Sequence, residues 1–274
     1  LSAEERSSVV ELSNPLNAEF SVLKNSLVPG LLANVEKNFS HRRNDVRLFE
    51  VRRVYRSSDK KSGDARLDTG VEEQLKLAIA ITGADIDECW QGTAPEFDFY
   101  SIKGVLESVL ELLNKGGIQY RALQSTVSYL HPGQSAELAQ GKRVYGHLGR
   151  LHPRVEKNFA FEQAVYIAEV DLEYFLSGEL ISPRFKNFGK FPAVERDFSA
   201  VVPEPVTAQV IRDYVAKQAR PLLKHLRFFD VYRGSRVPEK HVSYAFRIIL
   251  GAEDHTLTDT EIHSVQEKLM QGME

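Results

Sequence analysis

The sequence predicts an α+β protein with largely antiparallel sheets, organised as two domains of about 1–183 and 189–274. Stretches in which apolar and polar residues alternate, typical of half-buried strands, are interspersed with stretches of helical spacing, and this mixed order favours an α+β fold. The segment 180–190 contains proline and glycine and has no periodicity, which indicates a domain boundary. A length of 274 residues is enough for two domains that each have a hydrophobic core.

Helices and strands are expected to be mixed throughout the first domain. Pro29 suits the first turn of a helix, and Asp98 is an N-cap residue before an apolar stripe at helical spacing. The expected elements are a helix over 26–41, a strand over 45–56, an exposed loop over 57–70, a strand over 74–83, a helix after Asp98 that Gly116-Gly117 ends, strands over 119–125, 142–150 and 164–171, and a short helix over 153–159.

The second domain is expected to have the order βαββα. Its last helix begins with a capping box, in which Thr258 is the N-cap and Glu261 is at N3. This order is that of a ferredoxin-like, RRM-like fold without its last strand, so either the chain is cut before that strand or the sheet has three strands. The expected elements are strands over 196–202, 226–233 and 242–250, and helices over 207–219 and 259–270.

The strands over 226–233 and 242–250 each have two chemically distinct faces. One face is typical of a core and carries Phe229, Val231, Val242, Tyr244, Phe246, Ile248 and Leu250. The other face carries Phe228, Asp230, Tyr232, His241, Ser243 and Arg247. Aromatic rings, an acid, hydroxyls and a cation on an open sheet suit single-stranded RNA, which needs stacking platforms and groups that bind base edges.

Asp230 and Tyr232 are the leading candidates for base recognition. A carboxylate can accept two hydrogen bonds from the Watson–Crick edge of guanine, and a tyrosine two residues along shares its face and can stack on that base. The alternative is a hydrated sheet face that carries an incidental tyrosine.

Positive charge is concentrated around these strands, although the net charge of the whole chain is −3. Between 217 and 247 the only acids are Asp230 and Glu239, whereas the rest of the domain is acidic. A basic side on a neutral domain is typical of binding to a phosphate backbone, and a plain solvated surface is the alternative. The cations of this segment are Lys217, Arg220, Lys224, Arg227, Arg233, Arg236, Lys240 and Arg247.

Several motifs, taken in order, resemble the β subunit of bacterial phenylalanyl-tRNA synthetases. Its catalytic-like module is similar to NPLNAEFSVLKNSLVPGLL (14–32), LFEVRRVY (48–55), LHPGQSAEL (130–138) and GHLGRLHP (146–153). Its ferredoxin-fold anticodon-binding domain is similar to FPAVERD (191–197), FDVYRG (229–234), VSYAFRI (242–248) and TLTDTEI (256–262). Lys24 stands where the family usually has arginine, at a position expected on the surface.

The resemblance implies a class II synthetase-like antiparallel module followed by a tRNA-binding domain. It implies a catalytic α subunit and phenylalanine tRNA as partners, an (αβ)₂ heterotetramer and a cytoplasmic location. The whole enzyme would use ATP and magnesium, with no cofactor in this part and with the editing domain upstream. The implied site residues are Asp230, Tyr232, Ser243 and Arg247 for the anticodon, and Arg233, Arg236 and Lys240 for the tRNA backbone.

The first domain is not expected to catalyse aminoacylation. A class II synthetase needs an Arg-x-Glu motif to hold ATP and a glycine-rich third motif that ends in arginine. LFEVRRVY offers Glu50, Arg52 and Arg53 in another order, and Gly146-x-x-Gly149-Arg150 is too sparse. We expect the helix over 26–39 and the strand over 48–55 to cover an interface with the α subunit, because both are rich in apolar residues.

Other functions are weaker candidates. The histidines lack metal-ligand spacing, and His131 and His152 each precede proline and are expected to shape turns. The single cysteine, Cys89, excludes an internal disulfide framework. No apolar run approaches membrane length, and the start at Leu1 suggests a piece of a longer protein. A free-standing RNA-binding protein and an ACT-like amino-acid-binding regulator remain alternatives, although the turn over 202–205 lacks the glycines that an ACT domain needs.

Overall fold

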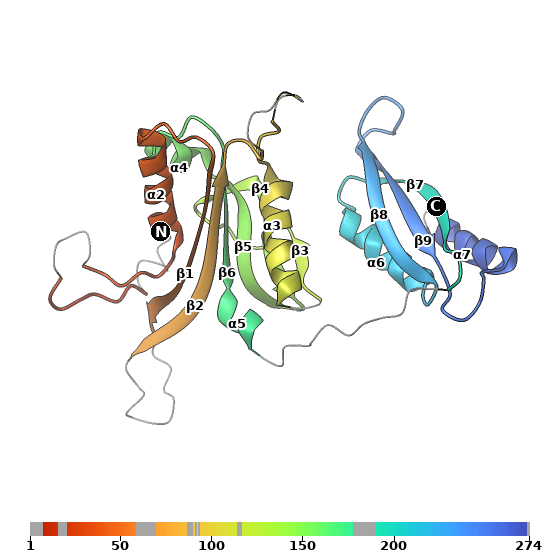
Figure 1. Ribbon diagram of the computed structural model, residues 1–274, viewed down its shortest axis with the longest axis horizontal. Coiled ribbons are helices and arrows are strands. Elements are labelled where there is room, and N and C mark those ends of the chain that lie inside the picture. Colours follow the sequence, from red (N-terminus) through yellow and green to blue (C-terminus); the bar gives the residue numbers. More distant parts are fainter. Residues whose placement is uncertain are drawn as a thin grey trace. The chain divides into compact units, whose positions relative to one another are not determined.

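The computed structural model divides into two compact units, 1–182 and 183–274, which are described separately (Figure 1). It describes residues 8–15, 21–58, 70–86, 90, 92, 94–113, 117–177 and 190–272. Cys89, most of the loop expected over 57–70 and the predicted domain boundary lie outside these residues. Within them, no helix is both long and apolar enough to span a bilayer.

The first unit is built on a six-stranded antiparallel sheet with the strand order β1-β2-β6-β5-β4-β3. Successive residues are buried along β6 and along the second half of β2, so the centre of this sheet is buried on both faces and carries a helix on each side. The strands are β1 (Val46–Ser57), β2 (Val71–Thr82), β3 (Gln119–Arg121), β4 (Leu130–Gln140), β5 (Arg143–Leu151) and β6 (Val165–Asp171).

Two helices, α2 (Val28–Ser40) and α3 (Phe99–Leu112), cover opposite faces of this sheet (Figure 1). Alternate residues of β2 pack on each of them: Ala78 and Ala80 belong to the core under α2, whereas Leu77, Ile79 and Ile81 belong to the core under α3. Asp98 caps α3 as predicted, since its side chain accepts a hydrogen bond from the Ser101 amide at 2.8 Å. Two short helices follow β5 and β6, namely α4 (Pro153–Asn158) and α5 (Leu172–Leu176).

Strand β4 is the main element that the sequence analysis missed. Pro132 and Gly133 are turn residues, and the pairing with β5 shifts register between Leu130 and Ser135, so the first part of the strand has no regular alternation. The strand expected over 119–125 is shorter than predicted, since β3 spans only Gln119–Arg121.

The second unit has the predicted order βαββα around a three-stranded sheet, β7-β9-β8, in residues 190–272. One face of β9, with Tyr244 and Phe246, packs in the same core as the buried residues of both helices. The two helices therefore cover one side of the sheet and leave the other side open. The bounds are β7 (Val194–Pro203), α6 (Ala208–Gln218), β8 (Leu223–Tyr232), β9 (His241–Leu250) and α7 (Asp259–Gln271).

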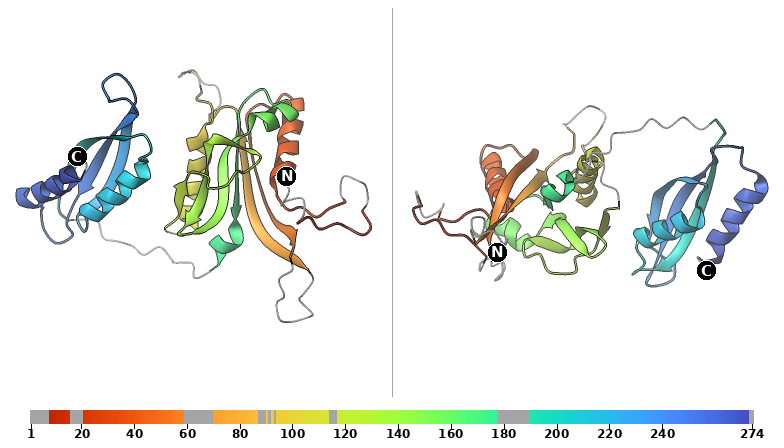
Figure 2. Two further views of the ribbon diagram at one scale, coloured as in Figure 1. Left: turned by 180° about the vertical axis from the view of Figure 1, so that it is seen from behind. Right: turned by 90° about the horizontal axis from the view of Figure 1, so that it is seen from below.

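A β-bulge in β8 overturns the predicted faces of two phenylalanines. Phe228 pairs with Phe246, but the next pair is Asp230 with Ala245, so Phe229 is an extra residue on its strand. Phe228 therefore packs into the core, and Phe229 is 52% exposed. Val231, predicted in the core, is 49% exposed because the tip of the β8–β9 hairpin extends beyond both helices (Figures 1 and 2).

The start of α7 has the predicted capping box and an additional histidine. Thr258 Oγ1 accepts a hydrogen bond from the Glu261 amide, and the Glu261 carboxylate accepts one from the Thr258 amide. His255 lies between Asp254 (2.8 Å) and Glu261 (3.0 Å). The bonds to Asp254 and then Glu261 raise the pKa of His255 above its usual 6.5. The Thr258 bonds, with that to His255, lower the pKa of Glu261 to about 2.

We expect this contact to make the second unit less stable as the pH rises above 6.5. Because the pKa of His255 is raised on folding, its protonated form stabilises the folded state. This stabilisation is complete at pH values below the usual pKa of 6.5, and it is lost as the pH rises through the pKa of the folded state. The contribution of Glu261 runs in the opposite direction and is lost as the pH falls from 4.5 toward 2. His255→Gln should therefore be less stable than the parent near pH 5.5, and the difference in melting temperature should shrink toward pH 8. A constant difference from pH 5.5 to 8 would contradict this explanation.

Candidate nucleic-acid interface

Three of the predicted site residues lie close together on the open face of the second unit. In β9, Val242, Tyr244 and Phe246 are in the core, so the side chains of Ser243 and Ala245, which alternate with them, point to the opposite face. Asp230 is opposite Ala245, and Tyr232 is opposite Ser243. The bulge thus places Asp230, Tyr232 and Ser243 together where no helix covers the sheet.

The ring of Tyr232 is held against the backbone of the hairpin turn. A Cβ atom at Gly234 would lie 2.6 Å from the Tyr232 hydroxyl oxygen and 2.8 Å from the ring carbon that bears it. A larger residue here would displace the ring, so the glycine of the FDVYRG motif lets the ring lie over the turn. The ring is still 39% exposed, and its free surface is available for stacking.

Ser199 on β7 joins this site, and the sequence analysis did not find it. Its hydroxyl lies 3.0 Å from the hydroxyl of Ser243, and either group can donate the hydrogen bond. Next to it, Val201 pairs with Ser243 across the strands and is 46% exposed. Ser199 could be placed beside Ser243 only from the strand order of the sheet, in which β7 lies next to β9.

Arg247 lies on the same face but is bound to two acids of β7. Its Nε and Nη2 atoms donate to the Asp197 carboxylate at 2.7 and 2.9 Å, and Nη1 donates to Glu195 at 2.9 Å. The guanidinium holds the pKa of Asp197 below its usual range, and the Asp197 contact raises the pKa of Arg247. Arg247 is also four residues from Ser243 along β9, roughly 13 Å. The structure therefore does not group Arg247 with the other three residues.

The turn from β8 to β9 carries the three predicted backbone-binding cations. Arg233, Arg236 and Lys240 are all exposed, and no acid of the described chain forms an ion pair with them. The turn is ordered by a hydrogen bond from the Val237 amide to Gly234. Lys240 has a φ of 60°, and its carbonyl accepts the Glu204 amide. The positive charges therefore project from a fixed turn beside Tyr232.

The turn after β7 offers little backbone for an ACT-type ligand. Pro203 and Pro205 have no amide hydrogen, the Glu204 amide donates to Lys240, and the Val206 amide donates to Pro203. These bonds use the donors that an amino-acid ligand would need at this turn.

The residues that resemble synthetase motifs in the first unit are used in its packing. Glu50 is bound by Lys24 at 3.1 Å and Arg52 at 3.8 Å, so Lys24, which is exposed as expected, links the N-terminal segment to β1. Arg150 donates two hydrogen bonds, of 3.0 and 3.1 Å, to Glu156. A Cβ atom at Gly146 would lie 2.5 Å from the carbonyl oxygen of Glu169, so this glycine allows close strand approach.

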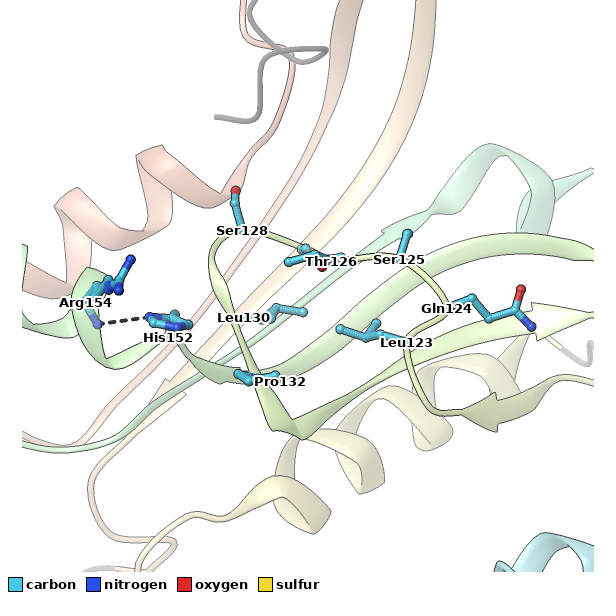
Figure 3. A pocket seen from close by; sticks show the side chains of 10 residues that line it. Leu123, Gln124, Ser125, Thr126, Ser128, Leu130, Pro132, His152 and Arg154 are labelled. Atoms are coloured by element: carbon cyan, nitrogen blue, oxygen red, sulfur yellow. Dashed lines mark hydrogen bonds between the residues drawn. The ribbon is translucent and has the colours of Figure 1, made fainter. Parts of the chain in front are cut away.

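A cavity of about 420 Å³ lies between the loop before β4 and the start of α4 (Figure 3). His152 caps α4, and its Nδ1 atom accepts a hydrogen bond from the Arg154 amide, as the dashed line in Figure 3 indicates. His131 makes the same kind of bond with the Gly133 amide, so both histidines shape turns as predicted. The lining of the cavity includes no carboxylate, and among the described residues no group of three or more His, Cys, Asp and Glu could hold a metal ion.

Comparison with known families decides the assignment. Residues 1–172 match the model of the phenylalanyl tRNA synthetase beta chain CLM domain, and residues 189–274 match that of the ferredoxin-fold anticodon binding domain. The chain belongs to the phenylalanyl-tRNA synthetase beta chain family. This confirms the resemblance noted in the sequence, and it agrees with the α+β fold of both units.

Curated members of the family match almost the whole chain. The phenylalanine–tRNA ligase beta subunit of Clostridium acetobutylicum is 31% identical over 97% of this chain, and that of Syntrophotalea carbinolica is 33% identical over 96%. The chain spans about a third of these relatives, namely 31% and 32% of their lengths. Among solved structures, the pyrrolysyl-tRNA synthetase PylSc of Desulfitobacterium hafniense aligns with 64% of this chain and 53% of its own, with a TM-score of 0.45 and 16% identity, values too low to add to the assignment.

Proposed function

We propose that this chain is the tRNA-binding and assembly part of a phenylalanine–tRNA ligase β subunit. Its second unit recognises the anticodon of phenylalanine tRNA, and its first unit packs against the catalytic α subunit in an (αβ)₂ heterotetramer. The observation that carries the proposal is the open sheet face on which Asp230, Tyr232 and Ser243 lie beside an exposed cationic turn.

The chemistry of this face suits a guanine at the first anticodon position. The Asp230 carboxylate can accept hydrogen bonds from N1–H and N2–H₂ of the base, and the ring of Tyr232 can stack on it. Ser243, held by Ser199, adds a hydroxyl opposite Tyr232. Arg247 is proposed to contact the anticodon through the N–H groups that its two acids leave free, since a guanidinium has five.

The proposal is tested by binding of the purified chain to phenylalanine tRNA and to a copy whose first anticodon guanine is replaced by adenine. We expect tighter binding of the native tRNA, and weaker binding of both as salt increases, because Arg233, Arg236 and Lys240 would contact phosphates. Equal affinities would remove base recognition from the proposal. Failure to bind either tRNA would remove RNA binding as well.

The reaction would take place in the assembled enzyme, in the cytoplasm. We propose that ATP and magnesium bind the α subunit and that this chain holds no cofactor of its own. Ion pairs in the first unit support this assignment of ATP and magnesium to the α subunit, because charged groups of the synthetase-like motifs already have protein partners. Arg150 pairs with Glu156, and Glu50 pairs with Lys24 and Arg52.

The proposed contact with the α subunit lies along β1. Phe49 is 74% exposed and Val51 is 45% exposed, and both line an apolar groove of about 690 Å³ that β2, α3 and α5 complete. Exposed apolar surface on an edge strand is typical of an interface. Helix α2, which was expected to share this interface, instead turns its apolar side inward, where Val28, Leu31, Leu32 and Val35 are buried.

Phe49→Asp is expected to weaken assembly with the α subunit by about tenfold or more, because it puts a charge into an aromatic contact of the kind that dominates interfaces. Leu112→Asp is the matched control, since Leu112 is 85% exposed and does not line the groove. Both variants can be compared by co-purification and titration with the α subunit. Unchanged assembly of Phe49→Asp would place the interface elsewhere.

A further inference from the structure

The bulge in β8 presents an aromatic ring that the proposed site does not use. Phe229 is the extra residue between Phe228, which pairs with Phe246, and Asp230, which pairs with Ala245. Ala245 is therefore opposed by two residues, and its methyl group leaves room above the open face.

The two adjacent phenylalanines have opposite environments. The ring of Phe228 lies 5.6 Å from that of Phe246 and 5.9 Å from that of Tyr244, within the core. The ring of Phe229 is half exposed and is absent from the core cluster. No ring or cation of the described chain packs on it. A large exposed ring with no aromatic or cationic partner among the described residues, beside a carboxyl group, marks a contact surface.

We infer that Phe229 is a second stacking platform, for the nucleotide next to the guanine that Asp230 binds. This inference rests on the proposed function. Phe229 precedes Asp230 by one residue, and Tyr232 follows it by two. Two successive unpaired bases can therefore each stack on one of the two rings. Stacking accepts any base, so Phe229 would add affinity without adding sequence preference. The cationic turn from Arg233 to Lys240 lies in the same hairpin and can hold the phosphates that join these nucleotides.

The test uses the whole chain and an RNA hairpin with the phenylalanine anticodon loop. The fluorescent base 2-aminopurine replaces the nucleotide on either side of the guanine in turn. Phe229→Ala and Phe229→Leu are expected to lower the affinity about five- to a hundredfold, the range for loss of one stacked base. In the parent, stacking on Phe229 should quench 2-aminopurine at one of the two positions. Both variants should lose this quenching. Phe229→Trp should keep the affinity and the quenching.

Val231→Ala is the matched control, because Val231 is exposed to a similar degree two residues along the same strand but pairs with Tyr244 of the core face. It should bind within about twofold of the parent. If Phe229→Leu keeps full affinity and quenching while Asp230→Ala is weakened, the second platform is wrong and the proposed function stands. If the parent itself does not bind the hairpin, the proposed function fails first. Melting temperatures of all variants separate loss of binding from loss of folding.

Discussion

Asp230→Ala is expected to weaken binding of phenylalanine tRNA by about five- to a hundredfold, because two hydrogen bonds from one base to a carboxylate are worth about 1–3 kcal/mol. The loss should depend on the base. A tRNA with adenine at the first anticodon position has no matching pair of donors, so parent and variant should bind it equally. The measurement is a titration of both proteins with both tRNAs.

Tyr232→Ala provides the contrast within the same site. Its ring can stack on any base, so its removal should weaken binding of both tRNAs to a similar extent, by about 1–3 kcal/mol. If Asp230→Ala instead reduced the affinity for both tRNAs equally, the carboxylate would not be recognising guanine, and the assignment of this site would be wrong.

Glu169→Ala is expected to destabilise the first unit by about 3–5 kcal/mol, the effect of removing one partner of a buried ion pair. Glu169 is 7% exposed, and its carboxylate accepts hydrogen bonds from Lys76 at 3.0 Å, Ser26 at 2.8 Å and the Leu27 amide at 2.7 Å. Its loss leaves the Lys76 ammonium buried without a counter-charge, and it leaves the start of α2 without an acceptor.

Denaturant unfolding of the first unit would measure this effect. Glu73→Ala is the matched control, because the pair of Glu73 with Arg53 spans 3.7 Å and both side chains are about half exposed, so its loss should change stability by less than about 1 kcal/mol. The double variant Lys76→Met/Glu169→Leu should recover much of the stability, since it removes both buried charges. A small effect of Glu169→Ala alone would mean that water reaches Lys76.

Local patterns predicted much of the fold. The apolar run in β2 and the capping box at Thr258 depend on neighbouring residues only. The capping box lies where expected, and the strand expected over 74–83 spans Val71–Thr82. Strand β4 was missed because Pro132 and Gly133 interrupt its pattern, and its pairing with β5 holds it in the sheet. A bulge adds one residue on one strand without any signal in the sequence, and for this reason Phe228 and Phe229 were assigned to the wrong faces.

The site was predictable to the extent that one hairpin forms it. Asp230, Tyr232 and Ser243 are on paired strands, and their shared face follows from period 2 once the strands are recognised. Ser199 and the acids that bind Arg247 come from β7, more than forty residues away in the chain. Their role depends on which strand is in the centre of the sheet, and this tertiary property has no local sequence signal.

The acids of β7 also limit how far an RNA strand can extend over the open face. Arg227 pairs with Arg247 across the strands, so Glu195, Asp197, Arg227 and Arg247 together carry no net charge, whereas the turn from Arg233 to Lys240 has a net charge of +2. A polyanion that followed β9 away from the tip would therefore lose the electrostatic attraction of the tip within a few nucleotides. The domain therefore has a short electrostatic footprint, which matches the few exposed bases of a loop better than an extended strand, and non-specific polynucleotides gain little from its far end.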